Sequence, residues 1–233
     1  MNPLPILFYG VPSGCSFGSI VALEWLARPY QLCRIEMPAV VSSDTYKRVN
    51  PVGETPSLLA AKGELLSGSM AILHHLGALG IDRKLGHPQG SRGFDRLNQM
   101  LGFLNTTFFG AFSPLWHALE HGSEGEEKKA LTAFGRAKVE KAHAQLEALL
   151  GDQPWLLGQE RTLADAYFIG IARWTKYHEV VDRRDYPALQ RLFDKLEAEP
   201  AVKVAHAIEA QRAAVSAGGF VGHIGLEEAL ARP

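Results

Sequence analysis

The spacing of apolar residues changes near residue 80. Before that point, short apolar runs bounded by Gly and Pro alternate with stretches of helical spacing, as in strands interleaved with helices. The pattern predicts strands at 6–9 and 31–35, helices at 16–27, 43–49 and 69–79 (the last capped by Ser69), and a hairpin of 55–60 with 63–66. This order indicates an α/β domain with a mixed sheet, which we place at residues 1–82.

After a glycine- and proline-rich segment at 80–90, apolar residues recur only at helical spacing. The sequence Thr162-Leu-Ala-Asp165 has the form of a capping box with Asp in place of Glu. The tail from Ala217, rich in glycine, is expected to be irregular. We therefore place an all-α domain at residues 91–233. Its helices are predicted at 97–115 with a kink at Pro114, at 126–150, from Thr162 onward, at 186–198 and at 200–214.

Composition limits the possible functions. Hydrophobic residues make up 46% of the 233 residues and charged residues 21%, as in an ordinary soluble protein. The 24 basic and 25 acidic residues leave no basic field for nucleic acid. No apolar run approaches the ~20 residues that cross a membrane, and the start, Met1-Asn-Pro-Leu-Pro5, does not look like a secretory leader. Two cysteines cannot form a disulfide scaffold, so we expect a cytoplasmic protein without membrane or nucleic-acid partners.

The turn after the first predicted strand carries the candidate chemistry. Cys15 lies near the start of the next helix, where free amides and the positive end of the helix dipole stabilise an anion and lower a thiol pKa. Ser13 and Ser16 could hydrogen-bond a thiolate, and the phenol of Tyr9 is expected within reach. A cysteine at such a place is also commonly a small buried residue, and a serine a helix cap. Cys33, in an apolar strand, is expected in the core.

Three motifs occur in order along the chain. They are Asn50-Pro-Val-Gly-Glu-Thr-Pro-Ser-Leu-Leu59, Leu66-Ser-Gly-Ser-Met-Ala-Ile-Leu-His-His-Leu76 and Arg161-Thr-Leu-Ala-Asp-Ala-Tyr-Phe168. Together they resemble the glutathione S-transferase family, and the turn Ser13-Gly-Cys-Ser16 is most similar to the bacterial beta class. The resemblance implies a thioredoxin-like N-terminal domain, an all-α C-terminal domain, a homodimer and glutathione as co-substrate in detoxification.

The resemblance also implies roles for particular residues. Pro56 would follow a cis bond, and the backbone of Thr55, with Glu54 beside it, would pair with the cysteinyl part of glutathione. Ser69, with Gly68 before it, would bind the γ-glutamyl carboxylate at a helix start. The catalytic group would be Cys15, Ser16, Ser13 and Tyr9. The wall of the second-substrate pocket, facing a small hydrophobic electrophile, would be Phe108, Phe109, Phe112 and Trp116.

Three positions depart from the family pattern. Gly68 stands where an acidic residue or Gln is usual, Phe109 where the beta class has His beside the thiol, and Gly102 where a polar residue lines the pocket. The main hypothesis is an enzyme that activates the glutathione thiol for attack on an electrophile. Glutathione-dependent thiol–disulfide exchange through Cys15, a non-catalytic binding protein, and keto-acid isomerisation in the manner of the zeta class stay open.

A metal site is not expected. His117 and His121 share the spacing of two ligands on one helix, but no third ligand accompanies them at a suitable spacing. We interpret the pair as part of a solvated helix end.

Overall fold

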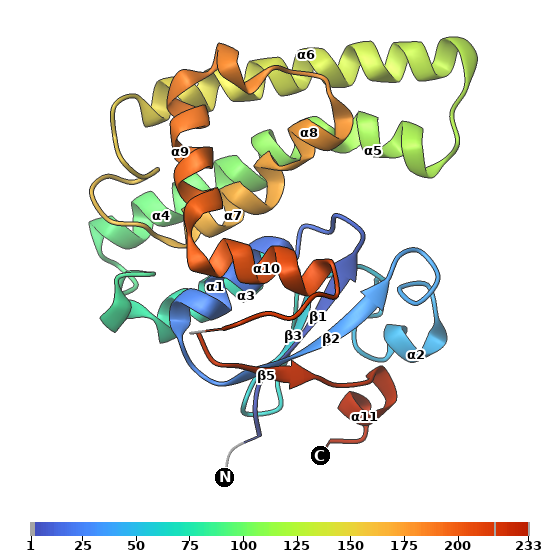
Figure 1. Ribbon diagram of the computed structural model, residues 1–233, viewed down its shortest axis with the longest axis vertical. Helices are drawn as coiled ribbons and strands as arrows, with labels where there is room; N and C mark the ends of the chain where they lie inside the picture. The colour runs from blue at the N-terminus through green and yellow to red at the C-terminus, as the bar shows by residue number, and fades with distance from the viewer. Residues whose placement is uncertain (1–2, 217, 233) are drawn as a thin grey trace.

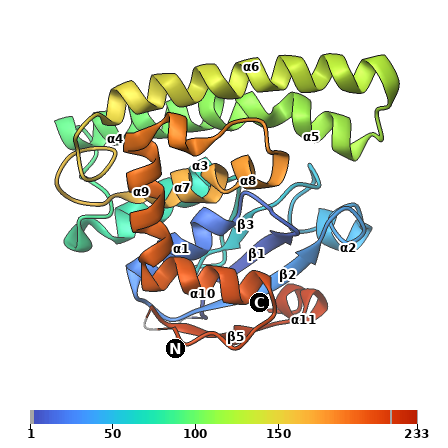
Figure 2. The same ribbon diagram turned by 45° about the horizontal axis from the view of Figure 1, so that its top comes forward.

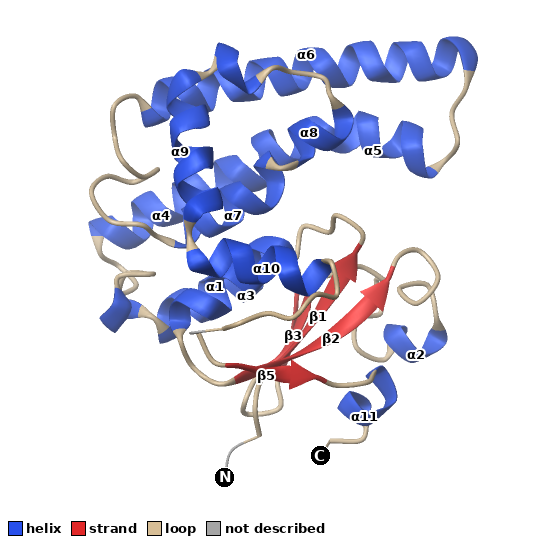
Figure 3. Cartoon of the chain, in the orientation of Figure 1, coloured by secondary structure: helices blue, strands red, loops and turns tan. Residues whose placement is uncertain are grey.

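The computed structural model describes residues 3–216 and 218–232. Figure 1 and Figure 3 show the strands gathered in one half of the molecule and long helices in the other, with α6 running along the far side. A mixed α/β part is thus followed by a helical part, as predicted. The strands are β1 (Ile6–Val11), β2 (Tyr30–Glu36), β3 (Ser57–Leu59), β4 (Leu65–Ser67) and β5 (Phe220–His223).

Most helices lie where the apolar spacing predicts them. The α-helices are α1 (Phe17–Leu26), α2 (Asp44–Lys47), α3 (Ser69–Leu79), α4 (Arg92–Phe103), α5 (Ser113–Glu120), α6 (Gly125–Leu150), α7 (Leu163–Ala172), α8 (Trp174–His178), α9 (Pro187–Ala198), α10 (Pro200–Glu209) and α11 (Leu226–Leu230). A π-helical segment, η2 (Leu104–Phe109), and a 3-10 turn, η3 (Gly110–Phe112), separate α4 from α5, just before Pro114. Further 3-10 turns are η1 (Ile81–Arg83) and η4 (Arg183–Asp185).

The sheet has the order β4-β3-β1-β2-β5. β1 runs parallel to β2 and antiparallel to β3, which pairs antiparallel with β4. Side chains alternate between two faces along β1, so Leu7 and Tyr9 join the core beneath α1 and α3, whereas Ile6 and Phe8 join a smaller core on the opposite face. The two faces therefore belong to separate apolar clusters.

The expectation of an irregular tail is wrong. Phe220–His223 forms β5, which pairs parallel with β2, and Leu226–Leu230 forms α11. Figure 1 and Figure 2 show this last segment beside the N-terminal strands, away from α6. The glycines of the tail hide this strand from the apolar pattern. Its stability comes from pairing with β2, which is far away in the sequence, so local periodicity does not predict it. The division at residues 82 and 91 stays a prediction, with β5 in the sheet of the first part.

Glycine allows the two halves to meet closely. Every residue of α1 is buried, because the helix lies between the sheet and α7. A Cβ added at Gly18 would lie 2.5 Å from the carbonyl oxygen of Ala166, and one added at Gly170 would lie 2.8 Å from the backbone nitrogen of Gly18. α1 and α7 therefore need glycine where they cross, because a side chain there would overlap the backbone of the other helix.

Gly18→Ala is expected to lower the free energy of unfolding by about 1–3 kcal/mol, because backbone atoms must move to admit the methyl group. Urea denaturation measures the change. The control is Gly102→Ala in α4, where an added Cβ meets nothing within 4 Å. Removing that glycine should be neutral or stabilising by up to ~1 kcal/mol. Equal effects at both positions would contradict close α1–α7 contact.

Candidate functional site

The Ser16 hydroxyl closes the turn between β1 and α1 through hydrogen bonds to the backbone of Gly10. Ser16 Oγ accepts a hydrogen bond from the Gly10 amide at 3.0 Å and donates to the Gly10 carbonyl at 3.4 Å. Ser16 is fully buried, so its hydroxyl closes the turn, and the prediction that it takes part in catalysis is wrong. Ser13 lies on the same turn with a φ of 53° and is only half-buried.

Two side chains of the helical half donate hydrogen bonds to the backbone of this turn. Arg173 donates from Nη2 to the carbonyl of Gly14 at 2.7 Å, and Trp174 donates from Nε1 to the carbonyl of Ser13 at 2.8 Å. Arg173 also forms an ion pair with Glu209 at 2.7 Å, and its guanidinium lies over the ring of Phe17. The turn is therefore positioned by both halves of the molecule. Sequence reasoning missed these residues because their partners are backbone carbonyls far away in the chain.

The Cys15 thiol lies between Thr55 of the first motif and Ser69 of the second. Its Sγ donates to the carbonyl of Thr55 at 3.5 Å, and Ser69 donates from Oγ to Cys15 Sγ at 3.7 Å. Burial raises the pKa of the thiol, and this effect exceeds the lowering by the Ser69 hydroxyl and by Arg173. The expected lowering of the Cys15 pKa is thus wrong, since α1 begins only at Phe17 and the thiol is desolvated.

Cys15 is expected to react slowly with iodoacetamide at pH 7.5, at least ~10-fold more slowly than free glutathione, because little thiolate forms there. The rate should rise only above the ordinary thiol pKa of about 8.5. Mass spectrometry of the peptide that contains Cys15 follows the reaction, with urea-unfolded protein as control. A rate that matches glutathione and already levels off near pH 7 would contradict a raised pKa.

The segment before Pro56 presents its backbone through contacts with α2. Thr55–Pro56 is a cis peptide bond, as predicted. The carbonyl of Glu54 accepts hydrogen bonds from Tyr46 Oη at 2.9 Å and from Asn50 Nδ2 at 2.7 Å. The Glu54 side chain is exposed. These contacts fix the loop at Thr55, next to the Cys15 thiol.

Ser69 and Gly68 lie at the start of α3. Gly68, not Ser69, is the N-cap residue, and the Ser69 hydroxyl contacts Cys15 instead of capping the helix. Gly68 has φ 86° and ψ 141°, a conformation favourable only for glycine, and its amide donates to the Pro56 carbonyl at 2.9 Å. A side chain at position 68 would project into open space but would strain the backbone.

Tyr167 of α7 and Asn105 of η2 complete the polar cluster from the helical side. Tyr167 donates from Oη to Asn105 Oδ1 at 2.7 Å. Burial raises the Tyr167 pKa, the Cys15 charge adds to this rise, and the Ser69 hydroxyl opposes it. The sequence offered only a weak signal: a Tyr two residues after the capping-box Asp and an Asn near apolar residues.

The structure does not bring Tyr9 into this cluster. Its hydroxyl lies 3.0 Å from Nε2 of His223 in β5, and burial raises its pKa even though Arg34 lies nearby. The prediction that the phenol reaches Cys15 is therefore wrong. β5, which the apolar pattern did not predict, supplies the partner that holds Tyr9 elsewhere.

The predicted aromatic wall divides into two sets. Phe108 and Phe112 are fully buried, so their prediction as pocket residues is wrong. Phe109 and Trp116 are half-buried and contact Trp174, with ring centroids 5.3 and 5.2 Å away. Phe109, Trp116 and Trp174 together form an aromatic wall. This wall adjoins the turn, because Trp174 donates to the Ser13 carbonyl. The π-helical segment shifts the helical register, which spacing alone does not reveal.

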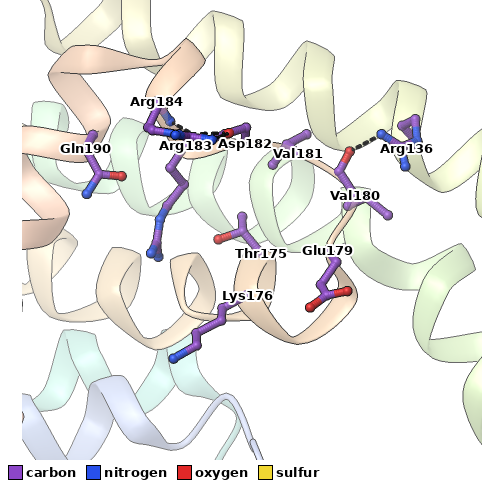
Figure 4. A pocket seen from close by; sticks show the side chains of 10 residues that line it. All are labelled: Arg136, Thr175, Lys176, Glu179, Val180, Val181, Asp182, Arg183, Arg184 and Gln190. Atoms are coloured by element: carbon purple, nitrogen blue, oxygen red, sulfur yellow. Dashed lines mark hydrogen bonds and ion pairs between the residues drawn. The ribbon is translucent and has the colours of Figure 1, made fainter.

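A hollow of about 510 Å³ lies on another side of α8 (Figure 4). It holds four basic residues, but Arg184 pairs with Asp182 and Arg136 donates to the Val180 carbonyl. In Figure 4, Arg183 approaches α8 from above and Lys176 extends from its lower side. Their charges do not converge, and the hollow contains no predicted site residue.

Two further observations concern the described part of the chain. Over residues 3–216 and 218–232, no group of three or more His, Cys, Asp and Glu side chains is placed to hold a metal ion. His117 and His121 stack on each other with centroids 4.2 Å apart. No helix in these ranges has the length and apolar character needed to cross a membrane.

A thioredoxin-like sheet, a cis-proline loop facing a helix start, and a following helical domain define the glutathione transferase class of fold. The glutathione S-transferase C-terminal domain model matches residues 103–200. Glutathione S-transferase GstA of Escherichia coli O157:H7 is 31% identical over 170 residues, which cover 72% of this chain and 81% of that protein. The chain belongs to the glutathione S-transferase family, whose enzymes catalyse glutathione conjugation.

Other relatives agree with this assignment. Glutathione S-transferase GST-4.5 of Xanthomonas campestris pv. campestris is 27% identical over 197 residues, covering 84% of this chain and 95% of that protein. A sphingomonad glutathione S-transferase solved with glutathione is 27% identical with a TM-score of 0.78, covering 88% of this chain and 98% of that one. The bacterial beta class enzyme of Sphingomonas chungbukensis is 26% identical with a TM-score of 0.77 and the same coverage.

Proposed function

We propose that this glutathione transferase joins the thiol of glutathione to a small apolar electrophile beside the turn at Cys15. One observation carries the proposal: the Thr55 carbonyl, the Ser69 hydroxyl and the Cys15 thiol lie in one hydrogen-bonded group, with contacts of 3.5 and 3.7 Å. This group faces both a loop that presents its backbone and a helix start. It therefore offers a peptide-binding edge and a carboxylate site next to each other.

In this proposal the cysteinyl backbone of glutathione pairs with Thr55, beside Glu54 and Pro56. The γ-glutamyl carboxylate lies at the start of α3, where Ser69 donates its hydroxyl and the free amides favour a negative charge. Gly68 contributes no side chain and its amide already donates to Pro56. The carboxylate site therefore depends mainly on Ser69.

The thiol of glutathione would lie among Cys15, Asn105 and Tyr167. Phe109 provides no base, so activation rests on donors and charge: the amide of Asn105, which the Tyr167 phenol orients, and the guanidinium of Arg173. The thiol loses its proton to solvent, and the thiolate sulfur attacks the electrophilic carbon to form a thioether, while the bond from that carbon to its leaving group breaks and the leaving group departs to solvent as an anion. Each unit by which these groups lower the thiol pKa corresponds to about 1.4 kcal/mol of thiolate stabilisation.

The remaining partners follow from the same site. Phe109, Trp116 and Trp174 provide an aromatic wall next to Ser13, which favours an apolar, aromatic electrophile. We further propose a cytoplasmic homodimer that serves in detoxification, in line with the resemblance of its turn to the beta class. Light scattering during size-exclusion chromatography tests the dimer.

Calorimetric titration with reduced glutathione tests the proposed site. The wild type should bind at micromolar to low millimolar concentration, and Ser69→Ala should weaken binding by roughly 10-fold or more, because a hydrogen bond to a charged group is lost. Ser113→Ala, at an exposed position of α5, is the matched control and should bind as the wild type does. No heat and no thermal shift at about 10 mM glutathione would remove glutathione from the site.

Thiol–disulfide exchange is the second candidate, because the Cys15 thiol lies among the residues assigned to glutathione. Its thiolate would attack the glutathione sulfur of a mixed disulfide between glutathione and another thiol, forming a Cys15–glutathione disulfide and releasing the other thiol as its thiolate. A second glutathione thiolate would then attack this disulfide, restoring the Cys15 thiolate and forming glutathione disulfide as the oxidised product. If Cys15→Ala loses reductase activity and keeps conjugation, exchange is supported. Binding without either activity would indicate a non-catalytic protein.

A further inference from the structure

A buried carboxylate anchors the start of the C-terminal tail. Glu24 of α1 is 7% exposed and accepts hydrogen bonds from Tyr30 Oη at 2.5 Å, Ser216 Oγ at 2.6 Å and the Gly218 amide at 3.2 Å. Ser216 Oγ in turn accepts from the amide of Phe220, the first residue of β5, at 3.1 Å. A buried charge held by three donors makes this attachment specific.

From this anchor the tail crosses the edge of the sheet. β5 pairs with β2, and the amide of Ile224 donates to the Leu32 carbonyl at 2.9 Å. The chain then forms α11 on the face of the sheet opposite α1. Ile224 and Ala229 are buried there in one apolar cluster with Tyr46 of α2.

α2 and α11 depend on each other. Isolated helices of this length do not form in water, so α2, which spans only Asp44–Lys47, relies on its packing. α11 contacts both α2 and β2, and Thr45 Oγ1 donates to Glu227 Oε1 at 3.3 Å across the pair. The tail therefore supplies part of the surface against which α2 is ordered.

α2 connects this support to the glutathione site. Tyr46 is fully buried, and it donates to the same Glu54 carbonyl that Asn50 contacts. A shift of α2 would move this carbonyl and, with it, the adjoining backbone of Thr55. Tyr167, and Phe17 beneath the Arg173 guanidinium, belong to the other apolar cluster, on the opposite face of the sheet.

We infer that the segment 218–232 positions the Glu54–Thr55 backbone for glutathione, acting through α2. The inference rests on the proposed function for the identity of the ligand. Loss of the support should weaken the binding of glutathione and spare the groups proposed to activate its thiol, because Asn105, Tyr167 and Arg173 lie outside the apolar cluster that holds α11. Such a change raises KM for glutathione and preserves kcat.

Ala229→Asp tests the inference, because Ala229 is 2% exposed and a carboxylate there must detach α11 from its cluster. Ala231→Asp adds the same charge two residues later at an exposed position and is the matched control. A second variant ends the chain after Ile224, which keeps β5 and removes α11. Ala229→Asp and the shortened chain should raise KM for glutathione roughly 10-fold with kcat within about twofold, and Ala231→Asp should match the wild type.

Amide hydrogen exchange supplies a measurement that needs no glutathione. In Ala229→Asp, amides of residues 45–57 should exchange at least ~10-fold faster, and those of α1 should not change. Unchanged exchange at 45–57 would overturn the inference even if KM rose. Faster exchange with unchanged KM, in a wild type that binds glutathione, would overturn it as well. A wild type that binds no glutathione would instead overturn the proposed function, and the exchange result would still decide whether the tail orders this loop.

Discussion

Arg173→Ala is expected to lower the free energy of unfolding by about 3 kcal/mol, because it leaves a half-buried carboxylate without its partner. Arg173 and Glu209 expose only 13% and 14% of their side chains and join through two hydrogen bonds, of 2.7 and 2.9 Å. The same guanidinium holds the carbonyl of Gly14 and covers the ring of Phe17. One substitution thus removes an ion pair, a contact to the turn and a contact between the two halves.

Urea denaturation measures this loss, and Arg173→Met with Glu209→Leu is the control. The double variant should be clearly more stable than Arg173→Ala, since no buried charge is left unpaired. It should still conjugate glutathione at least ~10-fold more slowly than the wild type, because the Gly14 carbonyl is no longer held and the turn at Cys15 is misplaced. Full activity in the double variant would show that Arg173 serves stability alone.

Asp165→Ala is expected to lower the free energy of unfolding by about 3 kcal/mol or more, because it leaves buried backbone donors unsatisfied. Asp165 is fully buried and accepts from the amide of Leu156 at 2.9 Å and from that of Thr162 at 2.8 Å. With the Thr162 side chain it completes the capping box of α7, as predicted from the sequence. The helix that carries Tyr167 and leads to Arg173 begins at this box.

The exposed Asp152→Ala is the matched control and should change stability by less than about 0.5 kcal/mol. A comparable loss in both variants would contradict a special role for the box.

The pH dependence of stability provides a second check on Asp165. Burial raises the pKa of Asp165 to about 6, against ~3.9 in an unfolded chain. Since the folded-state pKa is higher, the contribution is full below pH ~4 and declines as pH rises to about 6. Asp165→Asn should lack this decline.

Local chemistry explains the parts of the fold that the sequence predicted correctly. Apolar runs and apolar spacing located β1, β2 and most helices, because these elements bury apolar side chains that are close together in the sequence. The cis bond before Pro56 and the capping box at Thr162 were predictable from motifs, because each involves residues that are close together in the sequence. The family assignment followed from the same motifs taken in order.

The misassigned residues share one physical origin. Each of these side chains has suitable chemistry but is engaged elsewhere. Hydrogen bonds hold the hydroxyls of Tyr9 and Ser16, and the rings of Phe108 and Phe112 are buried in the core. Cys15 lies near the expected place, and its pKa rises because desolvation exceeds the favourable charges. Burial of this kind is set by packing between distant elements, so no local pattern reports it.

Short-range patterns encode helices, strands and turns, so they were enough to predict the two-part architecture, the family and the positions of Cys15, Thr55 and Ser69. That Tyr167, Asn105, Arg173 and Trp174 lie near these residues followed only from the folded chain. It also decided that a glycine-rich tail adds a strand and supports α2. The physical reason is the same in both cases: hydrogen bonds and apolar contacts between residues far apart in the chain depend on where the whole fold places them.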